Sequence, residues 1–463
     1  MFDTQTYVAR RNALREKVQH GLVVLPGNNE SPMNYAANGY RFRQDSNFRY
    51  FFGIDRAGFV GVMDVEEGTD CLYADNCDMD DIIWMGPQPT VQQLGEQVGV
   101  RRTFALSELQ KTIQRAIRYG RKIHFLPPYR EENRQMLSNL IGIKSGSLVN
   151  YVSELLIRSV VALREIKSAA EIDEIDKACD IGYLMHTEAM RLCRPGIYER
   201  EVAGAIEGVA TIYGNGVSFP SIVSQNGETL HNHYHGNKLA AGRLLLIDAG
   251  VESATGYSSD FTRTIPVDGR FTSGQKAVYE LVLEVNNRST AMIKKGVTYR
   301  SVHLASAKIL AAGLKELGLM KGEVDDIVAN GAQALFMPHG LGHQMGLDVH
   351  DMEDLGERFV GYDQEVERST QFGLGSLRMG RKLCAGHVLT VEPGVYFIPE
   401  LIAKWKREKI NDSFINYPAV EKYIGFGGIR IEDDVVVTAD GCRRLGKQRV
   451  PVTVAEVEAA MGK

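Results

Sequence analysis

Histidine is unevenly distributed along this chain. Of the eleven histidines, more than half fall in two short stretches, which contain His231, His233 and His235, and His339, His343 and His350. Imidazole exchanges protons near neutral pH and is a common ligand of metal ions. Histidines placed by packing alone would be spread more evenly, so these stretches are candidates for metal binding or acid–base chemistry.

Acidic residues lie at the ends of apolar, strand-like segments near these histidines, namely Asp248, Asp260, Glu392 and Glu432. An ionised carboxylate on a buried strand is unfavourable unless a cation compensates it. Any one of the four taken alone is better explained by a helix cap, a turn or an ordinary salt bridge. Four of them beside a histidine cluster favour a shared cation.

The charges of these groups predict a metal site with two ions. The four carboxylates neutralise two divalent cations, and a neutral His343 adds one nitrogen ligand. A donor set rich in oxygen with one imidazole suits Mn²⁺, with Co²⁺ or Zn²⁺ as alternatives. Two ions about 3.5–4 Å apart can hold a bridging hydroxide and stabilise a tetrahedral intermediate, so the predicted chemistry is hydrolysis.

Predicted strands and helices must bring these residues together. Hydrophobic patterning predicts strands over 243–249, 262–267, 387–392 and 428–438, and helices over 153–164, 274–294 and 299–317. Ser168 and Glu171 have the spacing of a capping box, which predicts that another helix begins there. Helices and hairpins are mixed along the chain, so we expect an α+β fold and not a parallel doubly wound sheet.

The segment from about residue 11 to 150 is expected to form a separate α/β domain. It has strand-like runs at 23–27 and 60–65, an aromatic-rich stretch at 48–54, and helical spacing over 103–118.

Five motifs along the chain resemble the metal-ligand motifs of the pita-bread metallopeptidases, the family of aminopeptidase P, prolidase and methionine aminopeptidase. In order they are Asp-Ala-Gly (248–250), Ser-Asp-Phe-Thr-Arg-Thr (259–264), His-Gly-Leu-Gly-His (339–343), Val-Glu-Pro-Gly (391–394) and Gly-Ile-Arg-Ile-Glu-Asp (428–433). Residues 42–50 also resemble the companion domain of aminopeptidase P and prolidase, which methionine aminopeptidases lack.

This resemblance implies an α+β architecture in which a C-terminal pita-bread (creatinase/aminopeptidase-like) catalytic domain follows a smaller α/β N-terminal domain. The expected boundaries are 1–152 for the N-terminal domain, 153–167 for a linker helix and 168–463 for the catalytic domain. Some relatives have lost their ligands and serve as peptide-binding modules, and creatinase-type relatives work without metal. All five ligand residues are present here, so the resemblance favours a metallopeptidase.

The resemblance also implies a role for each metal ligand. Asp248 and Asp260 would bind metal, with Asp260 in contact with both ions, and His343 would bind one ion. Glu432 would bridge the two ions, and Glu392 would bind one ion and shuttle a proton to the leaving nitrogen.

Several other residues are expected to contact substrate or support the ligands. His339 and His350 would steady the intermediate or touch the substrate, although either is also explained as a core histidine. His231 has the context of a mobile, substrate-contacting histidine, with His233 as a rival, whereas His235 is expected to face solvent. Arg430 shares a strand face with Glu432 and would orient a ligand carboxylate.

Two members of the family hydrolyse the bond before proline, whose nitrogen carries no hydrogen. The segments Met352–Arg378 and Glu400–Gly425 are longer than in most aminopeptidases P and favour a prolidase, which cleaves Xaa-Pro dipeptides. Arg378 resembles the prolidase arginine that meets the dipeptide carboxylate, a planar group that a guanidinium fits well. An aminopeptidase P acting on longer peptides with proline at the second position, and a surface role for Arg378, stay open.

Composition excludes other classes of protein. A length of 463 residues predicts two to three domains at about 150 residues each, and a net charge of −5 gives no sign of a nucleic-acid or acidic-membrane surface. No apolar run approaches the about 18 residues of a membrane helix, and the first 17 residues do not resemble a signal peptide. Six scattered cysteines without a C-x-x-C pair predict buried free thiols and a cytoplasmic location.

The stretch around Trp84 is relevant to whether this chain forms oligomers. Residues 82–86 resemble an N-domain segment that reaches a neighbouring subunit in oligomeric relatives, which favours a homodimer. A tryptophan buried in the core is an equally good explanation.

Overall fold

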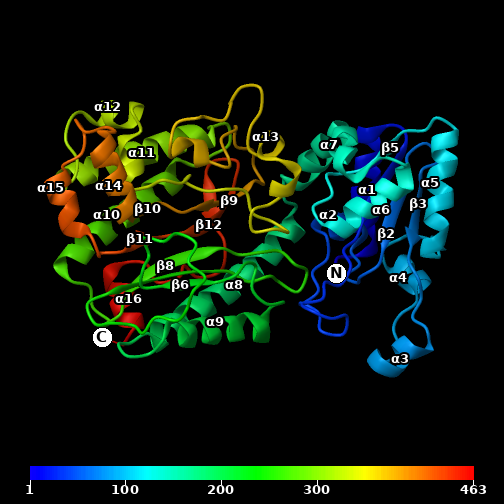
Figure 1. Cartoon of the computed structure of the whole chain (residues 1–463), viewed down its shortest axis with the longest axis horizontal. Coiled ribbons are helices and arrows are strands. Elements are labelled where there is room, and N and C mark those ends of the chain that lie inside the picture. The colour runs from blue at the N-terminus through cyan, green and yellow to red at the C-terminus, as the bar shows by residue number, and fades with distance from the viewer. Residues whose placement is uncertain (463) are drawn as a thin grey trace. The chain divides into compact units, whose positions relative to one another are not determined.

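The computed structural model describes residues 1–462. The chain divides into two compact units, which are residues 1–164 with 352–359, and residues 165–351 with 360–463 (Figure 1). The sequence prediction ended the first domain at residue 152 and treated 153–167 as a linker. The helix in question, α7 (Glu154–Arg164), instead belongs to the first unit.

The first unit is built around a mixed five-stranded sheet. Its strand order is β4-β3-β2-β1-β5, formed by Arg102–Phe104, Thr69–Tyr73, Val60–Asp64, Leu22–Pro26 and Ile123–His124. Its helices are α1 (Thr4–Val18), α2 (Ser46–Phe52), α3 (Met79–Met85), α4 (Val91–Gln97), α5 (Leu109–Arg118), α6 (Glu131–Ile141) and α7. The strands predicted at 23–27 and 60–65 are confirmed. The helical spacing predicted from residue 103 is wrong at its start, because residues 102–104 pair in parallel with β3 and the helix begins at Leu109.

A buried histidine makes the first unit sensitive to acid. The His124 side chain is fully buried, its Nε2 lies 3.1 Å from His20 O, and its Nδ1 lies 2.6 Å from Ser153 Oγ. Because the carbonyl can only accept, Nε2 carries the hydrogen and Nδ1 accepts from the hydroxyl. Burial lowers the pKa of His124 from 6.5 to about 4. The neutral ring is therefore the form that the fold requires.

We expect acidification to destabilise the first unit through this group. Between pH 6.5 and pH 4 the unfolded chain takes up a proton at His124 that the folded chain refuses, so the free energy of unfolding falls as the pH falls. Urea unfolding at pH 7 and pH 4.5 should show a smaller acid-induced loss for His124→Gln than for the wild type. His20→Gln, at an exposed neighbour, should behave as the wild type. An equal loss in the wild type and His124→Gln would contradict the prediction.

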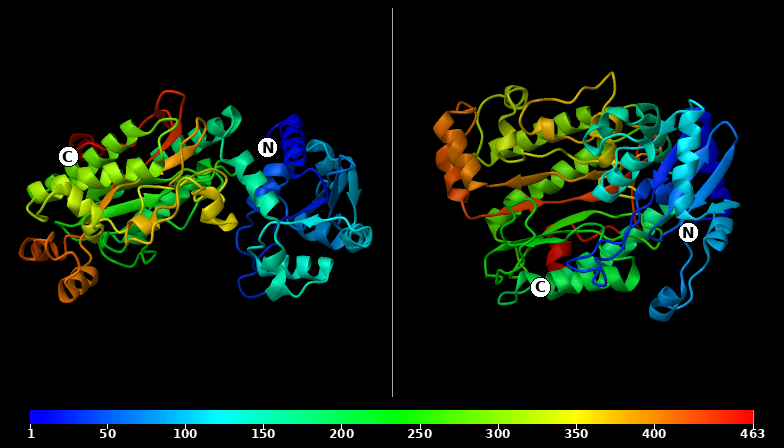
Figure 2. Two further views of the ribbon diagram at one scale, coloured as in Figure 1. Left: turned by 90° about the horizontal axis from the view of Figure 1, so that it is seen from above. Right: turned by 45° about the vertical axis from the view of Figure 1, so that its right-hand side comes forward.

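The second unit contains short antiparallel sheets. These are β6-β7-β8 (Ile222–Ser224, Leu244–Ala249, Phe261–Pro266), β13-β12-β9 (Cys442–Arg444, Asp433–Val437, Val388–Val391) and β10-β11 (Gly394–Tyr396, Gly428–Arg430). Two helix pairs lie on the strands, α8 with α9 (Ala169–Leu192, Glu199–Tyr213) and α10 with α11 (Ser273–Met292, Tyr299–Glu316) (Figure 2). The shorter helices of this unit are α12 (Val324–Ala329), α14 (Pro399–Glu408), α15 (Tyr417–Val420) and α16 (Val454–Ala460), whereas most of α13 (Glu357–Val360) belongs to the first unit.

The predicted elements of this unit agree closely with the observed ones, with one exception. The capping box is present, since Ser168 N donates to Glu171 Oε2 at 2.9 Å and the Ser168 hydroxyl accepts from Glu171 N, and α8 begins at Ala169. The strand predicted over 428–438 is instead two strands, β11 and β12. The chain leaves one sheet and enters another at residues 431 and 432, and local alternation does not reveal that change of partner.

The observed exposure of individual side chains corrects other predictions made from the sequence. The Trp84 side chain is 85% exposed, so its interpretation as a core residue is wrong, and the homodimer stays a prediction. All six cysteines are unpaired, but only Cys179 and Cys193 are buried and Cys384 is exposed. Among residues 1–462, no single helix is long and apolar enough to span a membrane, and one bent pair (Ser145–Tyr151 with Glu154–Arg164) passes that test by length and composition only.

Candidate metal centre and active-site pocket

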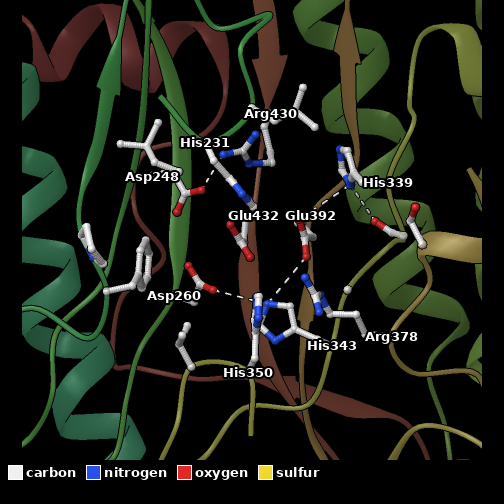
Figure 3. Close-up of a pocket in the computed structure, with 18 of the residues that line it drawn as sticks. His231, Asp248, Asp260, His339, His343, His350, Arg378, Glu392, Arg430 and Glu432 are labelled. Atoms are coloured by element: carbon white, nitrogen blue, oxygen red, sulfur yellow. Dashed lines mark hydrogen bonds and ion pairs between the residues drawn. The ribbon is translucent and has the colours of Figure 1, made fainter. Parts of the chain in front are cut away.

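The second unit has a cavity of about 400 Å³ into which the predicted site residues converge (Figure 3). Residues from both histidine stretches and from all five motifs line it, namely His231, His233, Asp248, Asp260, His339, His343, His350, Arg378, Glu392, Arg430 and Glu432. Apolar side chains such as Phe219, Ile222 and Leu230 form part of its wall. The cavity therefore combines an apolar surface with a concentrated set of ionisable groups, as ligand-binding sites do.

The four carboxylates that line this cavity lie at or next to the ends of strands. Asp248 lies on β7, Asp260 directly precedes β8, Glu392 directly follows β9, and Glu432 lies between β11 and β12. In the β7–β8 register Asp248 is opposite Thr262, and Thr262 in turn forms a bridge with Glu432. The three segments therefore meet at one place, although they are far apart in the sequence.

Three of the residues have the geometry of a metal site. Asp260, His343 and Glu432 are buried, and each offers a ligand atom within 4.8 Å of the others. His343 Nε2 lies 3.5 Å from Asp260 Oδ2 and 3.7 Å from Glu392 Oε1. Asp248 and Glu392 are outside this three-residue set but line the same cavity.

Unpartnered carboxylate oxygens fit the binding of a cation. Asp248 Oδ1 and Asp260 Oδ1 are buried and have no hydrogen-bond partner within residues 1–462. Buried polar atoms in native proteins are nearly always paired, so two orphaned oxygens in one cavity call for a partner. A divalent cation satisfies such oxygens and matches the oxygen-rich donor set.

The surroundings of His343 prepare it to act as a ligand. Its Nδ1 lies 3.0 Å from Gln344 O, and because a carbonyl only accepts, Nδ1 carries the hydrogen and Nε2 presents a lone pair to the carboxylates. Its backbone N–H donates to Thr390 Oγ1 at 3.1 Å, which ties it to β9. Burial, followed by the charge of His350, lowers the pKa of His343 and keeps the ring neutral.

The carboxylates are strained electrostatically in the absence of a cation. Burial, followed by the charge of Glu432, raises the pKa of Asp260 well above its ordinary value, and burial with the charges of Glu392 and Asp248 does the same for Glu432. Burial raises the pKa of Glu392 to about 7. Ionising these carboxyls together is therefore unfavourable unless a cation lies beside them.

A hydrogen-bonded chain connects Asp248 to His339. The Arg430 guanidinium pairs with Asp248, donates through Nε to Thr262 Oγ1 at 3.0 Å, and donates through Nη1 to Tyr396 Oη at 2.8 Å. Because the hydroxyl of Tyr396 accepts from arginine, its own hydrogen is directed to His339 Nε2 at 3.0 Å. His339 Nδ1 then donates to Gly340 O at 2.7 Å.

Sequence reasoning missed Tyr396 and two threonines. The Thr262 hydroxyl donates to Glu432 Oε2 at 2.6 Å, and the Thr390 hydroxyl lies 3.4 Å from Glu392 Oε1. Each threonine is two residues from a predicted ligand and therefore shares its strand face, which is a signal that could have found both. Tyr396 lies on β10, in a different sheet from β9, so strand alternation does not connect it to Glu392.

Of the six histidines in the two clusters, all except His235 line the cavity. His231 and His233 are both exposed and both line the cavity, so its geometry accommodates either as the substrate-contacting histidine. The ring of His350 packs edge-on against that of His343, with 4.2 Å between centroids. His235 was expected to face solvent, but it is half-buried and its Nε2 lies 3.1 Å from Ser221 O. Arg378 is half-buried and points toward Glu392 and His343 (Figure 3).

Two family models and several curated relatives match this chain over nearly its whole length. Residues 173–439 match the family model described as metallopeptidase family M24, and residues 7–124 match that of the aminopeptidase P N-terminal domain. The chain is 33% identical to Xaa-Pro dipeptidase of Homo sapiens over 459 residues, which covers 96% of this chain and 89% of the relative.

Bacterial relatives also align with nearly the whole length of this chain. The chain is 33% identical to Xaa-Pro aminopeptidase of Escherichia coli (strain K12) over 469 residues, which covers 99% of this chain and 97% of the relative. The solved structure of Pseudomonas aeruginosa aminopeptidase PepP superimposes with a TM-score of 0.83 at 29% identity, covering 100% of this chain and 98% of that structure.

Proposed function

This chain belongs to metallopeptidase family M24, and from that premise we propose that it is a Xaa-Pro dipeptidase (prolidase) that uses two divalent metal ions. The observation that carries the proposal is the placement of Arg378 in the same cavity as the Asp260–His343–Glu432 group. A cation beside the metal group offers a place for the free carboxylate of a dipeptide. The relative named Xaa-Pro dipeptidase supports this substrate class.

We assign the metal ions to Asp248, Asp260, His343, Glu392 and Glu432. When bound, the ions supply an acidified water as the nucleophile and polarise the scissile carbonyl. Mn²⁺ is the proposed ion because four of the five donors are carboxylates, with Co²⁺ and Zn²⁺ as the alternatives to test. In this assignment Asp260, His343 and Glu432, whose ligand atoms lie within 4.8 Å of one another, would form the centre of the set.

The chain's own residues then handle the proton and the substrate. Glu392 accepts a proton from the nucleophile and returns it to the proline nitrogen, which has no hydrogen of its own and must be protonated to leave. His339 is held by the Tyr396 hydroxyl and faces Glu392, with 3.8 Å between its Nδ1 and Glu392 Oε2. His231 and His350 contact the substrate from the cavity wall, and Arg430 orients Asp248.

A paired assay with Mn²⁺ tests the proposal. One reaction measures proline released from a Xaa-Pro dipeptide, and the other measures the first residue released from a Xaa-Pro-Xaa tripeptide. We expect the dipeptide to be cleaved at least ten times faster by kcat/KM. Cleavage of neither peptide with Mn²⁺, Co²⁺ or Zn²⁺ would contradict the peptidase assignment itself.

An aminopeptidase P is the second candidate. It is favoured by the match of 98–100% of both chains to aminopeptidase PepP and by the high coverage of the Escherichia coli Xaa-Pro aminopeptidase. Preference for the tripeptide in the paired assay would establish this alternative and would remove the proposed role of Arg378.

The Tyr396 hydroxyl gives a further prediction. Tyr396→Phe leaves Arg430 Nη1 without its acceptor and His339 Nε2 without its donor. Residues that orient metal ligands typically contribute about 10- to 100-fold to activity or metal affinity, and we expect a loss of that size in kcat/KM. Tyr279→Phe is the matched control, because the Tyr279 hydroxyl is equally buried but donates to Val452 O away from the cavity. Activity within twofold of the wild type in Tyr396→Phe would refute the prediction.

A further inference from the structure

Asn286 makes an unusual pair of contacts behind the metal-binding carboxylates. It lies on α10, is fully buried, and donates from its single Nδ2 to Val391 O at 2.8 Å and to Ile431 O at 3.3 Å. Val391 directly precedes Glu392, and Ile431 directly precedes Glu432. One amide group therefore joins the peptide units that carry two of the proposed metal ligands.

The two peptide units lie just beyond the last registered pair of the β9–β12 ladder, in which Val391 is opposite Asp433. Glu392 follows the last residue of β9, whereas Glu432 lies where the chain passes from β11 to β12. At this end of the ladder the Ile431 N–H also donates to Pro393 O at 3.3 Å, so Asn286 adds a side-chain link to backbone contacts that already bring the two segments together. An NH₂ group has two hydrogens, so it can hold two carbonyls at once and define the distance between them.

An arginine determines which way the Asn286 amide points. Arg449 Nη2 lies 2.9 Å from Asn286 Oδ1, and since a guanidinium only donates, the oxygen must face Arg449 and the NH₂ must face the carbonyls. Arg449 is itself held by Asp433, with 2.7 Å between Nη2 and Oδ2. Arg263 occupies the other oxygen of Asp433 at 2.7 Å. The orientation of the amide is thus determined by a partly buried ionic network, in which Asp433 and Arg263 are buried and Arg449 is half-buried.

We propose that Asn286 is a positioning residue that, together with the β9–β12 ladder, sets the separation of Glu392 and Glu432 for metal binding. The inference rests on the proposed function, because it takes both glutamates to be metal ligands. It adds a residue that no motif contains and that touches neither the cavity nor a ligand side chain. Its effect passes through the backbone, from the amide to the two carbonyls and from there to the carboxylates.

The alternative is that Asn286 only joins α10 to the strands and contributes to stability. Metal affinity separates the two, since a purely structural contact lowers the melting temperature without changing the dissociation constant for metal. Asn286→Asp keeps the shape of the side chain and the oxygen that faces Arg449, whose charge favours the ionised carboxylate, but it loses both donors. Asn287→Asp is the matched control.

The control adds the same charge one residue further along the helix. Asn287 is exposed, and its Oδ1 accepts from Arg449 Nη1 at 3.0 Å and from Arg444 Nη2 at 3.2 Å. It shares the arginine with Asn286 but does not hold the two peptide units. Any effect that passes through Arg449 alone should therefore appear in both variants, and the uncharged Asn286→Ser variant separates the effect of a buried charge.

Calorimetric titration of the metal-free proteins with Mn²⁺ is the decisive measurement. We expect Asn286→Asp to raise the dissociation constant of at least one Mn²⁺ by tenfold or more and to lower kcat on a Xaa-Pro dipeptide, with KM within twofold of the wild type. Asn287→Asp should leave all of these within twofold. Unchanged Mn²⁺ affinity in Asn286→Asp, with or without a lower melting temperature, would overturn the inference.

A second variant keeps the test decisive if the first does not fold. Asn286→Ser introduces no charge and is too short to reach both carbonyls, and it should weaken Mn²⁺ binding in the same direction. Measurements on the wild-type protein distinguish a failure of this inference from a failure of the proposed function. If the wild type binds no Mn²⁺, the proposed function fails, whereas wild-type binding that both Asn286 variants preserve overturns only the inference about Asn286.

Discussion

Replacing Asp260 with asparagine is expected to abolish peptidase activity and at the same time to raise the melting temperature of the metal-free protein. Asp260 is one of the three buried residues with the geometry of a metal site, and its Oδ1 has no other partner within residues 1–462. An amide cannot supply the negative charge that a divalent ion requires. The contribution of a metal ion to catalysis is several kcal/mol, so we expect kcat/KM with Mn²⁺ to fall by at least about 1,000-fold.

The gain in stability has an electrostatic origin. Without metal, Asp260 is buried among other carboxylates, which is why its pKa lies well above the ordinary value of 3.8. A neutral amide of the same shape avoids that repulsion. The unfolded chain ionises Asp260 near pH 3.8 and the folded chain resists it, so wild-type stability falls as the pH rises above that value. The advantage of Asp260→Asn should therefore be small in acid and larger at neutral pH.

Thermal unfolding in a chelator, with and without added Mn²⁺, checks both effects. A domain of this size gains about 2–4 °C for each kcal/mol of stability, which is readily measured. Mn²⁺ should stabilise the wild type and not Asp260→Asn. Asp325→Asn is the control, because Asp325 is exposed and pairs with Lys308 away from the cavity. Mn²⁺-dependent activity in Asp260→Asn, or a lower melting temperature of its metal-free form, would contradict the interpretation.

Replacing Arg378 with glutamine is expected to remove the preference for dipeptides. In the proposed function Arg378 receives the free carboxylate of a Xaa-Pro dipeptide at the rim of the metal group. Truncating one partner of a buried, hydrogen-bonded charge pair loses about 2–5 kcal/mol, and each 1.4 kcal/mol is about tenfold. We therefore expect kcat/KM for the dipeptide to fall roughly 30- to 4,000-fold.

The tripeptide provides the internal comparison for this prediction. Its carboxylate is one residue further from the scissile bond, so its kcat/KM should change less than threefold in Arg378→Gln. Arg381→Gln is the matched control, since Arg381 is three residues along the same segment but pairs with Glu165 at 2.7 Å and does not line the cavity. Arg378→Lys should recover only part of the activity, because an ammonium lacks the planar fork of a guanidinium. Equal losses on both peptides would mean that Arg378 does not recognise the dipeptide carboxylate.

The amino-acid sequence was sufficient to predict the candidate ligands and most of the elements that carry them. Asp248, Asp260, Glu392 and Glu432 were found because each ends or begins an apolar run, and the strands β7, β8 and β9 lie within two residues of their predicted bounds. The start of α8 was found from its capping box. These signals are local, since strand alternation and helix capping depend on residues two to four positions apart.

The structure was needed wherever a contact joins distant segments. Nothing near residue 431 indicates that one predicted strand divides into two, because the division results from a change of pairing partner. The exposure of Trp84 and the burial of His235 depend likewise on what packs, or does not pack, against them. The association of residues 352–359 with the first unit is also invisible in the sequence pattern.

The sequence by itself therefore determined which chemical groups are available, a set of carboxylates and histidines suited to divalent metal ions and hydrolysis. Only the tertiary structure decided how they are held. Tyr396 joins Arg430 to His339, and Asn286 reaches carbonyls 105 and 145 residues further along the chain. Side-chain hydrogen bonds over such separations form only after the strands and helices have packed. The identity of a ligand is thus a local property of this chain, whereas its position is a property of the whole second unit.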